Sequence, residues 1–304
     1  GEISYKELLK IDTVCSWIED WEGVDNCESL SESRLLKYVP RKMTTTYTDT
    51  LVEKSIGSRA SDGYLAFNLI YEDPDGDMTA SWLTVMSYDG TVKTMTPLYY
   101  GKDLYRAAGL KMWDDDYVLA AIGKKTDLDG YAYKWDWRSG EYSKYSTREI
   151  DIHDVQRVNE GADFWSLYHE AFAKVSKSGD LVVGYNSVGG TPSDDIWDLN
   201  HVQAVADDDY VFLSSRLTKT IYKVKSSTGA KVWALGGDDG TFAITDIDGK
   251  TYAAGKSAWH GQHNAEYIGD DEYAMFDNNY EHATKHSRLL IVKIDEATST
   301  ANVT

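Results

Sequence analysis

The chain has few prolines, only two cysteines, no long apolar run and a shortage of basic residues. Its 304 residues include 4 prolines against 22 tyrosines and 10 tryptophans, a composition rich in the aromatic residues that strands favour. Because no run of about 18 apolar residues occurs, no membrane-spanning helix is expected. Asp and Glu number 50 against 31 Lys and Arg, and the formal net charge of -19 makes nucleic acid or an anionic membrane an unfavourable partner.

The two cysteines, Cys15 and Cys27, have no second pair of metal ligands beside them, which argues against a zinc site. We predict that they form a disulfide, with free thiols as the alternative. Asn302-Val303-Thr304 is a glycosylation sequon. Together these features favour a secreted protein, or one in a periplasm-like compartment. The chain starts at Gly1 without a signal peptide, as expected of a processed or trimmed chain.

A pattern of short strands and tight turns repeats along the chain from about residue 60. In each copy an aromatic residue opens a strand, and a hairpin follows it. The hairpin turns carry Asp-Gly, Ser-Gly or Thr-Gly, because a tight turn needs a residue with positive φ. The strand-opening residues lie 53, 48, 45 and 63 positions apart, and they are Tyr64, Tyr117, Trp165, Tyr210 and Tyr273.

A period of roughly 40–50 residues with several short strands in each copy is typical of the blades of a β-propeller. Five blades are readable, and no long helical period appears after residue 60. The sequence therefore predicts an all-β protein with a β-propeller at residues 61–304. Residues 1–60 are predicted to form an N-terminal cap or the closing strand.

Three histidines occupy the same place in successive repeats. His201 and His263 each open a short alternating run that precedes an acidic turn and a tyrosine-opened strand, and His153 starts a looser copy. The first strand of a propeller blade lines the central channel, so we expect these side chains to converge at one end of it. Arg106 stands eleven positions before Tyr117, in the same place of an earlier repeat. Basic and protonatable groups gathered in an acidic chain predict an anion or proton-transfer site.

Seven motifs follow one another in the second half of the chain. They are His153-Asp154-Val155, Asn200-His201-Val202-Gln203, Leu213-Ser214-Ser215-Arg216, Val232-Trp233-Ala234-Leu235-Gly236-Gly237, Gln262-His263-Asn264, Met275-Phe276-Asp277-Asn278 and Ser287-Arg288-Leu289. In order and approximate spacing they resemble arylsulfotransferase-like proteins, most closely the branch found in fungi and other eukaryotes. The resemblance covers about residues 60–304. It implies a six-bladed propeller that moves a sulfuryl group from a phenolic sulfate to another phenol, without a nucleotide donor, a metal or a cofactor.

The resemblance also implies roles for individual residues. His263 matches the family's nucleophile, which becomes a transient sulfohistidine. His153 and His201 match histidines that bind the sulfuryl oxygens or move protons, and Arg216 matches the arginine that neutralises the sulfuryl group. The residues predicted to contact the substrate are Asn200, Gln203, Asn264 and Arg106.

The chain departs from the family pattern at three points. Gln203-Ala204 stands where the family usually has Asn-Ser, and Asn264 stands where it usually has Asp. A carboxylate at that second position would orient the imidazole better than an amide does. Another blade usually follows, so the ring is expected to be closed by residues 1–60, by a missing segment, or by a second copy or another chain.

Each assignment has an alternative. His263 can be a core histidine bonded to a backbone carbonyl, Arg216 can form a salt bridge between blades, and three converging histidines can hold a metal. The propeller can also serve another reaction in its channel, such as a cycloaddition in secondary metabolism, or be a non-catalytic binding or structural protein. The remaining histidines are predicted in a loop (His260) or at the surface (His169, His282 and His286).

Overall fold

A computed structural model covers the whole chain. It describes residues 3–4, 42–43, 64–72, 78–87, 92–100, 103–125, 127–158, 161–168, 171–188, 191–192, 198–205, 208–280 and 286–304. The predicted disulfide and most of the predicted cap therefore lie outside the described residues. Within those ranges all regular structure is strand, and no helix is long and apolar enough to cross a membrane. The chain divides into two compact units, Gly1–Leu128 with Tyr133–Ser143, and Asp129–Ala132 with Lys144–Thr304.

The first unit is built from antiparallel strands. A pair of two-residue strands, a three-stranded sheet in the order β3-β4-β5 and a run in the order β6-β7-β8-β9 make up its described part. Alternate residues of these strands face a core that includes Leu83, Val118 and Trp135, all of them 1% exposed or less. The strands are β1 (Ile3–Ser4), β2 (Lys42–Met43), β3 (Tyr64–Glu72), β4 (Met78–Ser87), β5 (Val92–Pro97), β6 (Tyr99–Tyr100), β7 (Asp103–Met112), β8 (Tyr117–Lys124) and β9 (Asp129–Asp136), the last of which crosses the division between the units.

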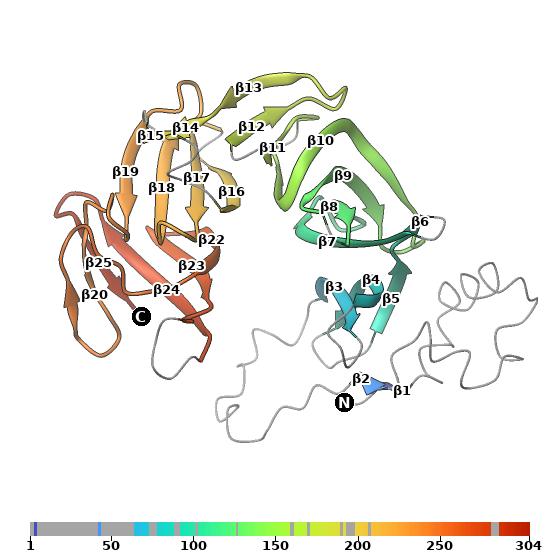
Figure 1. Cartoon of the computed structure of the whole chain (residues 1–304), viewed down its shortest axis with the longest axis horizontal. Helices are drawn as coiled ribbons and strands as arrows, with labels where there is room; N and C mark the ends of the chain where they lie inside the picture. Colours follow the sequence, from blue (N-terminus) through green and yellow to red (C-terminus); the bar gives the residue numbers. More distant parts are fainter. Residues whose placement is uncertain are drawn as a thin grey trace, which may run out of the picture. The chain divides into compact units, whose positions relative to one another are not determined.

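The second unit contains three successive four-stranded antiparallel meanders (Figure 1). The first belongs to an eight-stranded sheet and is β10 (Tyr142–Arg157, whose first two residues are assigned to the first unit), β11 (Phe164–Tyr168), β12 (Ala171–Val175) and β13 (Leu181–Tyr185). The second is β16 (Leu199–Val205), β17 (Tyr210–Ser215), β18 (Thr220–Lys225) and β19 (Lys231–Leu235). The third is β22 (Gln262–Gly269), β23 (Glu272–Asp277), β24 (Arg288–Asp295) and β25 (Thr300–Val303). Two further strands, β20 (Ala243–Thr245) and β21 (Thr251–Tyr252), extend this third sheet beyond β25. A separate short pair, β14 (Ser187–Val188) and β15 (Thr191–Pro192), comes between the first and second meanders in the sequence.

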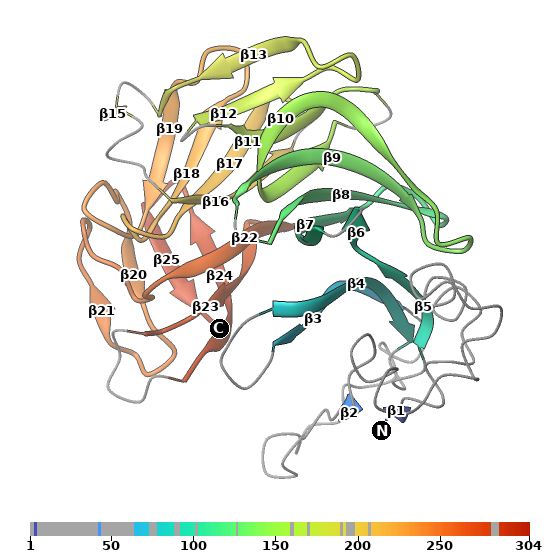
Figure 2. The same cartoon turned by 45° about the vertical axis from the view of Figure 1, so that its right-hand side comes forward.

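The meanders of the second unit pack on one another through apolar faces. Phe212 and Trp233 of the second meander meet Tyr273 and Met275 of the third in one buried cluster. Trp165 and Phe172 of the first share a cluster with Tyr222 of the second. Burying large side chains of this kind stabilises the fold by about 1.5–3 kcal/mol each. Figure 2 shows β16–β19 beside β22–β25.

Polar side chains also tie a strand of one sheet to a strand of a later sheet along the chain. In the second unit Asp154 Oδ2 accepts a hydrogen bond from Val202 N at 3.0 Å, and Asn200 Nδ2 donates to Gln262 O at 2.8 Å. In the first unit Asn68 Oδ1 accepts from Ala107 N at 2.9 Å. A buried backbone N–H or C=O needs such a partner where two sheets meet without sharing a ladder.

These sheets are the blades of a β-propeller: consecutive up-and-down meanders joined by hairpins. The fold-class prediction is thus confirmed, while the number of blades stays a prediction. The predicted turn glycines Gly140, Gly179 and Gly229 have φ of 80°, 95° and 67°, as tight hairpins require.

Two details of the repeat differ from the prediction. Tyr64 opens β3, the first strand of its described sheet, whereas Tyr210 opens β17, the second strand of its meander. The spacing of the aromatic residues cannot show which strand of a blade each of them opens, because successive strands of a blade have similar aromatic content. The strand after the turn at Gly140 is not one of the short strands that the repeat predicts but runs from Tyr142 to Arg157, since no Gly or Pro interrupts it.

Candidate functional site

The three repeat histidines all lie on the first strand of a four-stranded meander. His153 is on β10, His201 on β16 and His263 on β22. The pairing register of each strand shifts there, through a β-bulge or a similar irregularity, between Asp151 and Val155, between Leu199 and His201, and between His263 and Glu266 respectively. A bulge re-aims the side chains next to it, and bulges are frequent beside active sites.

His263 is half-buried, and its ring is held from one side. Its Nδ1 lies 3.0 Å from Gly261 O and 3.3 Å from Asn278 Nδ2. The shorter contact needs a proton on Nδ1, because a carbonyl oxygen only accepts. On that assignment the neutral ring carries its lone pair on Nε2, the nitrogen available for nucleophilic attack.

The pKa of His263 is held below its ordinary value of 6.5. Burial of the ring is the largest cause, because desolvation penalises the imidazolium. The positive charges of Arg216 and His153 lower the pKa further, while the Gly261 carbonyl and Asp198 oppose them. His263, Arg216 and His153 therefore lie close enough to act on one another electrostatically, and the imidazole is neutral at pH 7.

Arg216 is the residue that directly follows β17. Its Nε pairs with Asp198 Oδ2, and its backbone N–H donates to Asp198 O at 3.1 Å. The side chain of Arg216 remains 44% exposed, whereas that of Asp198 is 11% exposed. Arg216 thus forms a salt bridge within one meander, between the residue before β16 and the residue after β17, and not the bridge between blades given as the alternative; part of the guanidinium stays accessible.

His201 and Asp154 form a buried pair between two meanders. His201 Nδ1 lies 2.7 Å from Asp154 Oδ2, and the two side chains are 0% and 3% exposed. Asp154 Oδ1 also accepts from Val155 N at 2.9 Å. Among the described residues neither ring nitrogen of His201 has a hydrogen-bond partner, so its contact with Asp154 is that of an ion pair. A carboxylate on Nδ1 orients the ring and stabilises its protonated form.

His153 is also paired with a carboxylate, but it is accessible. Its Nδ1 lies 2.7 Å from Asp151 Oδ1, and the same oxygen accepts from His153 N at 2.8 Å. The His153 side chain is 22% exposed. Two of the three histidines thus have an Asp on Nδ1, and the third has a carbonyl oxygen.

The residues predicted to contact the substrate have different surroundings. Both polar atoms of the Gln203 side chain meet the backbone of Tyr267, with Nε2 donating to its O at 3.1 Å and Oε1 accepting from its N at 2.6 Å. Asn200 is 4% exposed and bonds Gln262 O. Asn264 is exposed in the left-handed region at φ 51°, where Asn is tolerated better than most residues. Their substrate-binding roles stay predictions.

Arg106 lies on β7 in the first unit, opposite Gly123 of β8. Its Nε is buried and has no hydrogen-bond partner among the described residues. Its convergence with the histidines of the second unit stays a prediction. The other histidines are His286, which is exposed as predicted, His260, which is partly buried, and His169 and His282, which lie outside the described residues.

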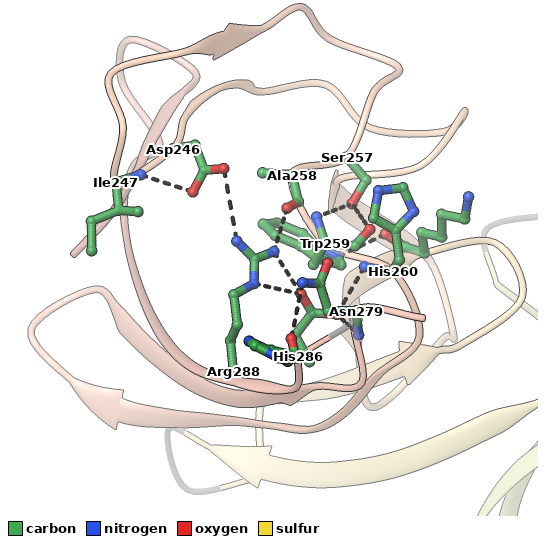
Figure 3. Close-up of polar contacts among 11 residues, drawn as sticks. Asp246, Ile247, Ser257, Ala258, Trp259, His260, Asn279, His286 and Arg288 are labelled. Atoms are coloured by element: carbon green, nitrogen blue, oxygen red, sulfur yellow. Dashed lines mark hydrogen bonds and ion pairs between the residues drawn. The ribbon is translucent and has the colours of Figure 1, made fainter. Parts of the chain in front are cut away.

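A polar network supports the segment that carries His263 (Figure 3). No role was predicted from the sequence for the residues of this network. Asp277 is fully buried, and its Oδ1 accepts from His260 N at 2.8 Å and from Asn279 N at 2.9 Å. Arg288 donates to Asp277 Oδ2 from Nη2 at 2.6 Å and to Ala258 O at 2.9 Å. The network therefore fixes the backbone just before Gly261 and His263.

Four further residues around the histidines were missed as site residues: Asp154, Asp198, Asn278 and Asp277. One signal was available for Asn278, which directly follows the second strand of its meander as Arg216 does. Among the described residues, no group of three or more His, Cys, Asp or Glu side chains is placed to hold a metal ion.

Residues 149–304 match the model of the family described as Arylsulfotransferase (ASST), which is just over half of the chain. The chain belongs to the arylsulfotransferase family. The matched region begins in β10 and includes all three repeat histidines and Arg216. No curated protein matches the chain.

Solved structures similar to this arylsulfotransferase family member share little sequence with it. A Bacteroides caccae protein of unknown function has 9% identity and a TM-score of 0.46, covering 78% of this chain and 98% of that one. The WD40 β-propeller domain of Doa1 has 10% identity and a TM-score of 0.43, over 76% and 66% of the two chains. The β-propeller domain of Myceliophteria thermophila Cps50 (Swd1) has 13% identity and a TM-score of 0.38, over 79% and 73%.

Proposed function

We propose that this protein transfers a sulfuryl group from a phenolic sulfate to a phenol through His263. The observation that carries the proposal is the state of that imidazole. It is neutral at pH 7, its Nδ1 is engaged by Gly261 O at 3.0 Å, and it lies in the field of Arg216. A neutral imidazole with a free Nε2 is a competent nucleophile, and nearby fixed positive charge stabilises an anionic transition state.

In the first step of the proposed reaction, Nε2 of His263 attacks the sulfur of the donor. The nitrogen–sulfur bond forms as the bond from sulfur to the aryl oxygen breaks, and the donor leaves as a phenolate. Arg216 offsets the negative charge on the sulfuryl oxygens, as electrostatic positioning does in related phosphoryl transfer. In the second step the acceptor phenol oxygen attacks sulfur, the nitrogen–sulfur bond breaks and His263 is restored.

The acceptor phenol must lose its proton in the second step. His153 is the better placed of the other two histidines, because its side chain is 22% exposed and its Nδ1 is paired with Asp151. A carboxylate on Nδ1 stabilises the imidazolium that forms when Nε2 takes a proton. His201 is fully buried, so its part in the proposal is to hold the channel wall through Asp154.

The test is a colorimetric assay with 4-nitrophenyl sulfate as donor and a phenol as acceptor, comparing His263→Ala with the wild type. We expect nitrophenolate release and sulfated acceptor from the wild type, and a loss of at least about 10³-fold in the variant. His286→Ala is the matched control, because it removes an exposed imidazole and keeps the backbone carbonyl that Asn279 Nδ2 contacts.

Activity that survives unchanged in His263→Ala would refute the assignment. A wild-type protein that binds neither donor nor acceptor would favour the non-catalytic alternative. A product formed from phenolic substrates without any sulfate transferred would favour another reaction in the channel.

A further inference from the structure

A row of side chains leads outward from His263 across the third meander of the second unit. His263 on β22 pairs with Phe276 on β23, and Phe276 pairs with Leu289 on β24. Residues directly opposite each other on neighbouring strands place their side chains on the same face of the sheet. The neighbouring row, Gln262 and Asp277, is fully buried and points to the opposite face. The backbone of Phe276 is therefore one strand spacing, about 4.8 Å, from the backbone of His263.

A second aromatic ring lies beside His263 through Gly261. Gly261 has φ 81°, and a Cβ built on it would lie 2.1 Å from Tyr280 Cε1, so the Tyr280 ring covers this glycine. The carbonyl of the same glycine contacts His263 Nδ1. His263 is thus flanked by Phe276 across the strand and by Tyr280 over the preceding turn.

These large apolar side chains are unusually accessible. Phe276 is 46% exposed, Tyr280 44% and Leu289 76%, whereas Phe164, Phe172, Phe212 and Phe242 are all 2% exposed or less. Among the described residues, no aromatic ring stacks on Phe276 or Tyr280. Large apolar groups that gather in the open beside a reactive side chain are typical of a binding site. We call Phe276, Tyr280 and Leu289 the apolar shelf.

We propose that the apolar shelf binds the aromatic ring of the phenolic substrate while its sulfuryl group meets His263. The inference rests on the proposed function and deepens it. In an aryl sulfate a single oxygen joins the ring to sulfur, so a ring whose sulfur contacts His263 lies within a few Å of that imidazole. Phe276 and Tyr280 offer faces for stacking at that distance, and Leu289 extends the apolar surface beyond them.

Binding to an unreactive protein tests the shelf separately from catalysis. The probe is 4-methylumbelliferyl sulfate, titrated into His263→Ala and into the double variant that adds Phe276→Ala, with inorganic sulfate as a competitor. We expect Phe276→Ala to weaken binding of the aryl sulfate about tenfold or more and to change the affinity for inorganic sulfate less than about twofold. Phe276→Tyr should restore binding, because it keeps the ring.

Ile268→Ala is the matched control, since Ile268 is 52% exposed at the other end of β22. It should leave the affinity for both probes unchanged. Three outcomes would each overturn the shelf. The affinity for the aryl sulfate does not depend on Phe276, or Phe276→Ala weakens binding of the aryl sulfate and of inorganic sulfate equally, or the aryl sulfate does not bind at all. A change of oligomeric state in Phe276→Ala, seen by sedimentation, would instead assign this face to a second copy of the chain.

The shelf and the proposed function can fail independently. Phe276-dependent binding of the aryl sulfate to a wild-type protein that transfers no sulfuryl group would support the shelf and refute the transfer reaction. Transfer with a KM unchanged by Phe276→Ala would support the reaction and refute the shelf.

Discussion

His201 and Asp154 belong to different meanders, yet Nδ1 of one lies 2.7 Å from Oδ2 of the other in a place that solvent hardly reaches. The same carboxylate oxygen accepts the backbone N–H of Val202 at 3.0 Å. One carboxylate thus lies in ion-pair contact with a buried imidazole and accepts a hydrogen bond from a buried amide where two blades meet. The pair holds the strand of His153 against the strand of His201, and so it sets the spacing of the candidate site.

Replacing Asp154 tests this contribution to stability. Asp154→Ala removes the acceptor of the Val155 and Val202 amides and the carboxylate beside the buried His201 ring, and breaking a buried pair of this kind costs about 3–5 kcal/mol of the free energy of unfolding. Asp154→Asn keeps the shape and one acceptor oxygen, and should cost less, about 1–3 kcal/mol. Urea denaturation measures both. Asp116→Asn, which breaks the exposed pair with Arg138, is the control and should change stability by less than about 1 kcal/mol. Equal effects at Asp154 and Asp116 would contradict the role of the buried pair.

The lowered pKa of His263 predicts a particular pH dependence of activity. Burial disfavours the imidazolium, so the neutral, nucleophilic form persists as the pH falls below 6.5. We therefore expect the acid limb of kcat/KM to have its midpoint below pH 6.5. A midpoint above that value would mean that another group limits the reaction or that His263 is not desolvated.

The same shift predicts a pH dependence of stability that needs no substrate. The unfolded chain binds a proton at His263 near pH 6.5, whereas the folded chain binds it only at lower pH. Between the two pKa values the unfolded state holds more protons, so this residue lowers the free energy of unfolding as the pH falls from about 6.5. Denaturation of His263→Ala should lack this component, and an identical pH dependence in the variant and the wild type would contradict it.

The charge of Arg216 is predicted to act on His263. Because that charge lowers the pKa of His263, Arg216→Gln should raise it, and Arg216→Lys should raise it less. NMR titration of the His263 ring measures the shift directly. The Gln variant should also lose about 10²–10³-fold in kcat, the usual cost of removing a group that stabilises transition-state charge. Arg138→Gln, an exposed arginine of the first unit, should change neither quantity.

Much of this arrangement could be predicted from sequence, because it repeats. The spacing of Tyr117, Tyr210 and Tyr273 follows from the number of residues a meander needs, and the glycines in the hairpin turns follow from backbone geometry. His201 and His263 stand out for the same reason, since equal positions in a repeat lie at equal places in a fold.

The partners of these residues could not be predicted, because each contact joins segments from different parts of the fold. Asp154 looks like any acidic residue of a very acidic chain until β16 is placed beside β10. The contact of Asn278 with His263 depends on how the turn at Gly261 brings the end of β23 toward β22. Local periodicity carries no information about either distance.

Comparing Ala substitutions at Gly261 and Gly249 separates the effect of crowding by a neighbouring side chain from the effect of backbone strain. Both have positive φ, 81° and 77°, so Ala at either position suffers a strained backbone, at a cost of about 1–2 kcal/mol. At Gly249 nothing lies within 4 Å of an added Cβ, whereas at Gly261 the Cβ would lie 2.1 Å from the Tyr280 ring. Gly261→Ala must therefore also displace Tyr280 or the turn whose carbonyl holds His263. We expect Gly261→Ala to lower kcat/KM at least about tenfold and Gly249→Ala to leave it within about twofold, although both lower the melting temperature. Similar kinetics for the two variants would show that the turn at Gly261 does not position the imidazole.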